Sequence, residues 1–253
     1  MPVVNNHHIQ IHYRTAGDQS TPPLILIFGM GMSCDEWFEF AYVEKLATHF
    51  YLVAIDPRAH GLSTKPHSSS NFTLDDLVSD IEAVTAHLQL PSAILWGYSL
   101  GSKIALAVAG SRPQLVSGLV LGGFELHSVV DLSNDLVLDT LANGAHAWVE
   151  LWKQMFDVPP ATAERMARCD TLALRELRIA ESCWPTLAKV PGKLDVPVIL
   201  YAGECCFFRD ATKKMKSLFQ HSVYYEHSGR NHFDLMVESD WISRKVIESF
   251  SDL

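Results

Sequence analysis

The stretch Gly97-Tyr98-Ser99-Leu100-Gly101 carries the strongest structural and chemical signal in this chain. It follows an apolar run from Ala93 to Trp96 with strand character, and a helical pattern runs from about Leu100 to Gly110. A Gly-x-Ser-x-Gly sequence between a strand and a helix is typical of a nucleophile elbow, a tight turn that lifts a serine hydroxyl above the edge of a sheet. The pattern therefore makes Ser99 a candidate nucleophile and favours acyl chemistry.

Short apolar strands alternate with helical patterns on both sides of this turn. Strand character is found in seven runs: Ile9 to Tyr13, Leu24 to Phe28, Tyr51 to Ile55, Ala93 to Trp96, Gly118 to Leu121, Val196 to Tyr201 and Ser222 to Glu226. Helices are predicted from about Asp35 to Thr48 and from Thr73 to about Leu88, where Thr73 and Asp76 have the spacing of a helix start. The pattern predicts an α/β fold, with a mostly parallel sheet of about eight strands flanked by helices.

The alternation stops between Phe124 and Leu194, where the pattern is mostly helical, and it resumes at Val196. This indicates a core domain formed by residues 1–123 and 195–253, with residues 124–194 inserted as a helical lid. Because ligands bind at the carboxyl edge of open α/β sheets, we expect the insert to cover that edge.

Composition excludes several classes of function. The 253 residues are 48% hydrophobic and carry a net charge of −9, so the chain has enough apolar residues for a buried core and no electrostatic attraction to nucleic acid. The apolar stretches are too short for a membrane span, and no secretory signal is visible, so we expect a cytoplasmic protein without a membrane partner. Five scattered cysteines lack metal-binding spacing, and no metal or other cofactor is expected.

Four segments together resemble the α/β-hydrolase family. They are the elbow and three further stretches, Phe28 to Gly31, Asp56 to Ser63 and Gly229 to Phe233. The resemblance implies that Ser99 is the nucleophile and His232 its general base, in the chain order that this fold uses. It also implies an oxyanion hole formed by the backbone N–H groups of Met30 and Leu100. Relatives with a carboxylate nucleophile, the epoxide hydrolases and haloalkane dehalogenases, are disfavoured because a serine occupies the elbow.

The third member of the triad departs from the family pattern. After the strand that begins at Val196 the family usually has Gly-x-x-Asp, whereas this chain has Gly203-Glu204-Cys205-Cys206, with a thiol in place of the carboxylate. We favour Glu125, just after the strand that ends near Leu121, and the alternative acid is Asp210. A third alternative is that no carboxylate acts as the triad acid. The activity would then be weak or specialised, because a neutral thiol does not stabilise an imidazolium as an aspartate does.

The lid and the strand ends predict a largely apolar pocket with few charged groups. Its expected lining residues are Phe28, Met32, Phe124, Trp148 and Trp152. We therefore expect a serine hydrolase, of the esterase type, that cleaves an ester, lactone or thioester of a hydrophobic small molecule through a Ser-His-acid triad and an acyl-enzyme. The alternative is a hydrolase-like ligand-binding protein or non-hydrolytic catalyst with a degenerate triad, marked by Cys206. A homodimer is compatible with the sequence.

Overall fold

The computed structural model describes residues 2–126 and 130–250 and contains an eight-stranded sheet. The strands are β1 (Val3–Asn6), β2 (Ile9–Ala16), β3 (Pro23–Ile27), β4 (Tyr51–Ile55), β5 (Ala93–Tyr98), β6 (Val116–Gly122), β7 (Val198–Gly203) and β8 (Ser222–His227). They lie in the order β1-β2-β4-β3-β5-β6-β7-β8. The pairs β1–β2 and β2–β4 are antiparallel and all other neighbours are parallel. The predicted mostly parallel sheet of about eight strands is confirmed.

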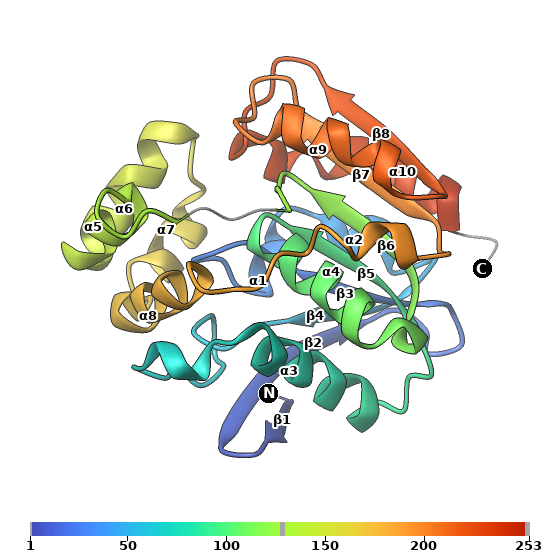
Figure 1. Cartoon of the computed structure of the whole chain (residues 1–253), viewed down its shortest axis with the longest axis horizontal. Helices are drawn as coiled ribbons and strands as arrows, with labels where there is room; N and C mark the ends of the chain where they lie inside the picture. Colours follow the sequence, from blue (N-terminus) through green and yellow to red (C-terminus); the bar gives the residue numbers. More distant parts are fainter. Residues whose placement is uncertain (1, 127–129, 251–253) are drawn as a thin grey trace.

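Helices flank this sheet and form a separate group beside it (Figure 1). Those that follow the core strands are α1 (Asp35–Glu39), α2 (Tyr42–Leu46), α3 (Leu74–His87), α4 (Leu100–Ser111), α9 (Arg209–Met215) and α10 (Ser239–Phe250). The separate group is α5 (Leu136–Ala142), α6 (Gly144–Met155), α7 (Pro160–Met166) and α8 (Thr171–Glu181). The described residues also form five short 3-10 turns, Ser69–Asn71 (η1), Pro113–Leu115, Pro191–Lys193, Lys216–Leu218 and Asp234–Val237.

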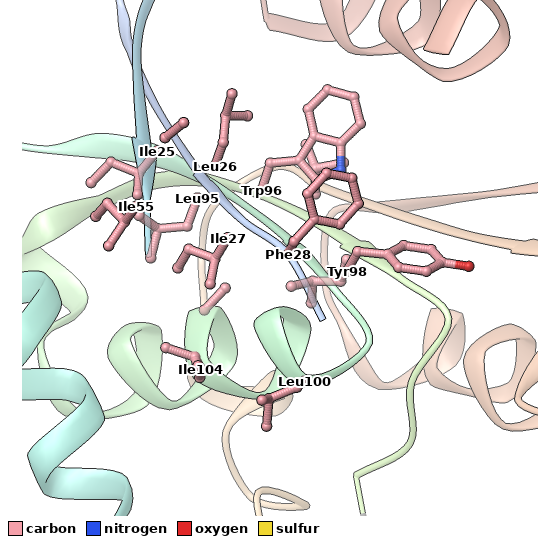
Figure 2. Close-up of a cluster of buried hydrophobic side chains, with 14 of the residues drawn as sticks. Ile25, Leu26, Ile27, Phe28, Ile55, Leu95, Trp96, Tyr98, Leu100 and Ile104 are labelled. Carbon is pink, nitrogen blue, oxygen red and sulfur yellow. The ribbon is translucent and has the colours of Figure 1, made fainter. Parts of the chain in front are cut away.

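The core is densest around the central parallel strands. In β3 the side chains of Leu24 to Ile27 are fully buried, as expected for a strand covered on both faces. Figure 2 shows this region, where Phe28, Trp96 and Tyr98 lie beside the aliphatic residues of β3 and β5. The rings of Phe28 and Trp37 stack with their centroids 4.0 Å apart. This packing fixes the end of β5, and therefore the position of the elbow.

The structure contradicts one local prediction and confirms another. The helix predicted from Asp35 to Thr48 is wrong as a single element, because Ala41 adopts a left-handed conformation (φ 61°) that divides it into α1 and α2. The predicted helix start at Thr73 is confirmed: its hydroxyl accepts a hydrogen bond from the Asp76 N–H, and the Asp76 carboxylate accepts one from the Thr73 N–H.

The helices α5–α8, residues 136–181, form the helical insert. In Figure 1 they lie together on the left, beside the end of the sheet toward which the arrowheads of β6 and β8 point. Residues 127–129, within the predicted lid of 124–194, lie outside the described residues, and the predicted domain boundaries stay a prediction. Over the ranges 2–126 and 130–250, no helix has both the length and the apolar character needed to cross a membrane.

Candidate active site

Ser99 is held in a strained conformation between β5 and α4. Its backbone has φ 54° and ψ −116°, outside the regions that a residue with a side chain normally occupies. The turn needs glycine on both sides, because a Cβ on Gly97 would lie 2.2 Å from the Gly101 carbonyl oxygen and one on Gly101 would lie 2.0 Å from the Ile27 carbonyl oxygen. The Ser99 N–H donates to the Gly122 carbonyl at 2.9 Å, which anchors the turn to β6. Strain that the surrounding structure holds in place is typical of functional sites.

His232 is presented by the loop between β8 and α10. The Tyr98 hydroxyl donates a 2.5 Å hydrogen bond to the His232 carbonyl, and the two rings stack with centroids 5.1 Å apart. Phe207 covers another side of the imidazole, with ring centroids 4.5 Å apart. This enclosure leaves the residue 6% exposed, and burial lowers the pKa of His232 to about 3. The imidazole is therefore neutral at physiological pH and able to accept a proton.

The partner of the His232 imidazole is a thiol. The Cys206 Sγ lies 3.3 Å from His232 Nδ1, and the Phe208 N–H also donates to this sulfur at 3.4 Å. Burial raises the pKa of Cys206 to about 11, so the thiol is protonated at neutral pH. The structure thus places the Cys206 thiol beside His232 Nδ1, and its position as the family's acid stays a prediction.

The two carboxylates considered for the acid role do not take part in this contact. Asp210 is the second residue of α9, where its side chain is 77% exposed and 3.6 Å from the guanidinium of Arg209. It does not cap that helix, whose N-cap is Phe208. Glu125 is half-buried just after β6, and within the described residues no hydrogen bond joins it to His232. Its role as the acid stays a prediction.

Ser99 and His232 line the same cavity, of about 400 Å³. Met30 and Leu100, whose N–H groups were predicted to form an oxyanion hole, line it as well. Leu100 is the first residue of α4, so its N–H has no acceptor within the helix and is available to an anion. Over the described residues no hydrogen bond links Ser99 directly to His232; such bonds are often long without substrate and shorten when it binds.

Aromatic and other apolar residues of the insert and of two core loops form much of the cavity wall. The predicted Trp148 and Trp152 line it, together with Leu151, Met155, Phe207, Phe208, Phe233 and Met236. Trp148 packs on the loop after β3. The contact is close at Gly31 (φ 80°), where a Cβ would lie 2.6 Å from the indole nitrogen of Trp148. The insert therefore contacts the loop that carries Met30.

Three of the predicted lining residues are core residues instead. Phe28, Met32 and Phe124 are each at most 3% exposed and are not among the described residues that line the cavity. Phe28 turns away from the pocket because it stacks on Trp37. The backbone of Phe124 is tied to the Thr212 hydroxyl, which accepts from its N–H at 3.3 Å and donates to its carbonyl at 3.0 Å. These residues support the site from behind.

The cavity wall also contains a charged cluster that was not predicted from the sequence. Lys103, on α4, and Arg178 and Glu181, on α8, all line the cavity. Lys103 Nζ lies 2.6 Å from Glu181 Oε1, and Arg178 Nη1 lies 2.6 Å from Glu181 Oε2. Burial alone raises the pKa of Glu181, but the charges of Lys103 and Arg178 outweigh it, so the pKa is lowered and the carboxylate stays ionised. The signal in the sequence was Lys103, which directly precedes the apolar run from Ile104 to Ala109.

A second cluster of titratable residues, His12, Cys34 and Asp56, has ligand atoms within 4.8 Å of one another. The Asp56 carboxylate accepts from the Cys34 N–H (2.6 Å), the Leu62 N–H (2.9 Å) and His12 Nδ1 (2.7 Å). These three donors make the buried carboxylate a structural anchor for the loops after β3 and β4.

Comparison with known proteins agrees with this architecture. A family model described as the alpha/beta hydrolase fold matches residues 22–181. The sn-1-specific diacylglycerol lipase ABHD11 of Danio rerio is 31% identical over 154 residues, covering 60% of this chain and 44% of that protein. Epoxide hydrolase 4 of Homo sapiens is 26% identical over 122 residues, covering 48% and 33%. The chain thus spans less than half the length of these two curated relatives.

Solved structures match over nearly the whole chain. The enol-lactonase from Burkholderia xenovorans LB400 has a TM-score of 0.87 and 17% identity, covering 98% of both chains. The esterase RhEst1 from Rhodococcus sp. ECU1013 has a TM-score of 0.79 and 21% identity, covering 99% of this chain and 97% of that one. At these identities the likeness shows a shared fold.

Proposed function

Because this chain belongs to the alpha/beta hydrolase fold family, we propose that it is a serine hydrolase that cleaves an ester, lactone or thioester of a small molecule through an acyl-enzyme on Ser99. The strained backbone of Ser99 (φ 54°, ψ −116°), on a cavity that His232 also lines, carries this proposal. A large apolar part of the substrate fits the aromatic wall. The expected cytoplasmic location and the possible homodimer stay predictions.

The proposed reaction uses only groups of this chain and water. Ser99 Oγ attacks the carbonyl carbon while His232 Nε2 takes the hydroxyl proton. The N–H groups of Met30 and Leu100 stabilise the oxyanion of the tetrahedral intermediate. Collapse of this intermediate breaks the bond to the leaving group, which receives the proton from His232. Water then attacks the acyl-enzyme carbonyl while His232 takes a proton from it. His232 returns this proton to Ser99 Oγ as the acyl–oxygen bond breaks, which releases the carboxylic acid.

The thiol at Nδ1 sets the expected rate. For Nε2 to accept a proton, Nδ1 must carry one, and its N–H then points at the Cys206 sulfur 3.3 Å away. A neutral thiol holds the ring in this tautomer but gives little charge stabilisation to the imidazolium that forms during attack. We therefore expect turnover well below that of an enzyme with a carboxylate at this position, where loss of the acid costs about four orders of magnitude.

A fluorophosphonate probe, which reacts with activated serines, tests the proposal. We expect one covalent adduct per chain, located on the peptide that contains Ser99 by mass spectrometry. Ser99→Ala should abolish labelling, and His232→Gln should slow it by about 100-fold or more. Ser111→Ala, at the exposed end of the same helix, is the matched control and should label like the wild type.

The second candidate function is ligand binding without turnover, and the Cys206 thiol is the observation that favours it. In that case the folded protein would not react with the probe, while apolar esters would still raise its melting temperature by binding the native state. This result would contradict the hydrolase proposal.

A further inference from the structure

The charged cluster of Lys103, Arg178 and Glu181 lies in the wall of the active-site cavity, and the proposed Ser99–His232 chemistry does not use it. The three side chains are 9%, 21% and 3% exposed, in that order. Removing charges from water is costly, and an apolar cluster of the same shape would often be as stable. Because these charged residues lie on the cavity, we infer that they contact the substrate.

The hydrogen-bonding character of the cluster is one-sided. Lysine and arginine are donors only, and both oxygens of the Glu181 carboxylate are engaged by these two cations. Arg178 also donates from Nε (3.3 Å) and Nη2 (2.7 Å) to the carboxylate of Asp135, which is not among the described residues that line the cavity. The cavity wall thus presents two cations and one anion. The group that complements this wall is an acceptor oxygen.

The cluster and His232 lie on opposite sides of Ser99. Helix α8 is attached to the segment after β4, where the Ser69 N–H donates to the Glu176 carboxylate at 2.7 Å. That segment belongs to the β4–β3 side of β5, whereas His232 follows β8, beyond β6 and β7. Figure 1 shows the same separation, with α8 and the cyan segment near residue 70 at the lower left and α9 and β8 at the top. Lys103 lies one helical turn after Ser99 on α4.

This arrangement orients the substrate. In the proposed function His232 must protonate the leaving group, so the leaving group lies on the side of the cavity where His232 and its aromatic neighbours are. The acyl part then extends toward the cluster. We propose, on the basis of that function, that Lys103, Arg178 and Glu181 form an acyl-side subsite for substrates whose acyl chain carries an acceptor oxygen, a carbonyl or a carboxylate, a few bonds from the reacting carbonyl.

Three 4-nitrophenyl esters with one leaving group and similar acyl length test the proposal: the hexanoate, the 5-oxohexanoate and the hydrogen glutarate. The first has no acceptor at the end of its chain, the second a neutral one and the third an anionic one. In the wild type we expect kcat/KM for at least one acceptor-bearing ester to exceed that for the hexanoate by about 10-fold or more, the effect of one hydrogen bond to a charged group. A preference shared by both identifies a general acceptor site, and a preference for the glutarate alone identifies an anion site.

Variants then locate the preference. Arg178→Met and Lys103→Met should each reduce it toward onefold, and the double variant Arg178→Met/Asp135→Asn does the same without leaving Asp135 as an unpaired charge. Arg175→Met, on the same helix and not among the described lining residues, is the matched control and should keep the preference. Because the readout is a ratio of two substrates on one protein, a general loss of activity does not move it.

Equal or better turnover of the hexanoate in the wild type would overturn the subsite, and so would a preference that survives both Arg178→Met and Lys103→Met. Failure of the hydrolase proposal looks different. In that case none of the three esters would be hydrolysed above the rate of Ser99→Ala, and the fluorophosphonate probe would leave Ser99 unlabelled.

Discussion

Two buried histidines in this molecule have opposite partners. His12 has the Asp56 carboxylate 2.7 Å from its Nδ1, while His232 has the Cys206 thiol 3.3 Å from its Nδ1. The hydrogen bond between His12 and Asp56 is like the one between the histidine and the acid of a catalytic triad. The Asp56 carboxylate nevertheless anchors two loops. The histidine–thiol pair lies on the cavity with Ser99. A carboxylate partner therefore does not by itself mark a histidine as catalytic, and the proposal for His232 rests on the cavity that it shares with Ser99.

The sharpest test of this comparison gives His232 the kind of partner that His12 has. Cys206→Asp places a carboxylate beside Nδ1, where it can stabilise the imidazolium of the transition state. We expect kcat for 4-nitrophenyl ester hydrolysis to rise by about 10- to 1000-fold, a part of the roughly 10⁴-fold that this acid supplies elsewhere. Steady-state kinetics with a matched Cys206→Ser variant, which stays near the wild-type rate, measures the effect.

The same assay tests the carboxylates predicted from the sequence. If Glu125 were the acid, Glu125→Gln would lower kcat far more than Asp210→Asn, and Cys206→Asp would bring little gain. If Cys206 occupies the acid position, both amide variants retain turnover close to that of the wild type.

Removing the carboxylate from the other histidine should change stability rather than catalysis. Burial by itself raises the pKa of Asp56, but the hydrogen bonds from His12, Leu62 and Cys34 outweigh it and lower the pKa. Asp56→Asn removes the charge that these donors stabilise and replaces one acceptor oxygen by a donor. We expect the free energy of unfolding to fall by about 2–4 kcal/mol in urea titrations.

In the remaining folded fraction of Asp56→Asn, labelling of Ser99 should proceed at close to the wild-type rate. A large loss of labelling in the folded protein would show instead that the His12 cluster contributes to the chemistry.

The smallest expected effect is a change in the shape of the pH profile. Burial lowers the pKa of His232 to about 3, so the base stays unprotonated and kcat/KM stays level between about pH 5 and 8, where a histidine of ordinary pKa, about 6.5, would lose activity toward the acid side. In Cys206→Asp the neighbouring negative charge favours the imidazolium and raises the pKa of His232. The loss of activity on the acid side should therefore appear at higher pH in that variant. An acid limb near pH 6.5 in the wild type would contradict the buried, uncharged surroundings of His232.

The elbow and the parallel sheet were predictable from local signals. Buried strands read as continuous apolar runs, and Gly97 is required because a Cβ there would clash with Gly101 of the same turn. The division at Ala41 was not predictable, because a single left-handed residue leaves the apolar pattern from Asp35 to Thr48 unchanged. Phe28 was misplaced for a similar reason: a residue at a strand end can face the cavity or the core, and its stacking on Trp37 decides for the core.

By itself the sequence determined that this chain forms an α/β sheet with a serine on a sharp turn, since backbone sterics and apolar periodicity act over short distances. Only the tertiary structure decided which groups meet there. The contact of Cys206 with His232 joins residues 26 positions apart, and that of Lys103 with Glu181 joins residues 78 apart. Such contacts depend on how strands and helices pack, and side-chain identity alone does not state the angle or the distance at which two loops approach.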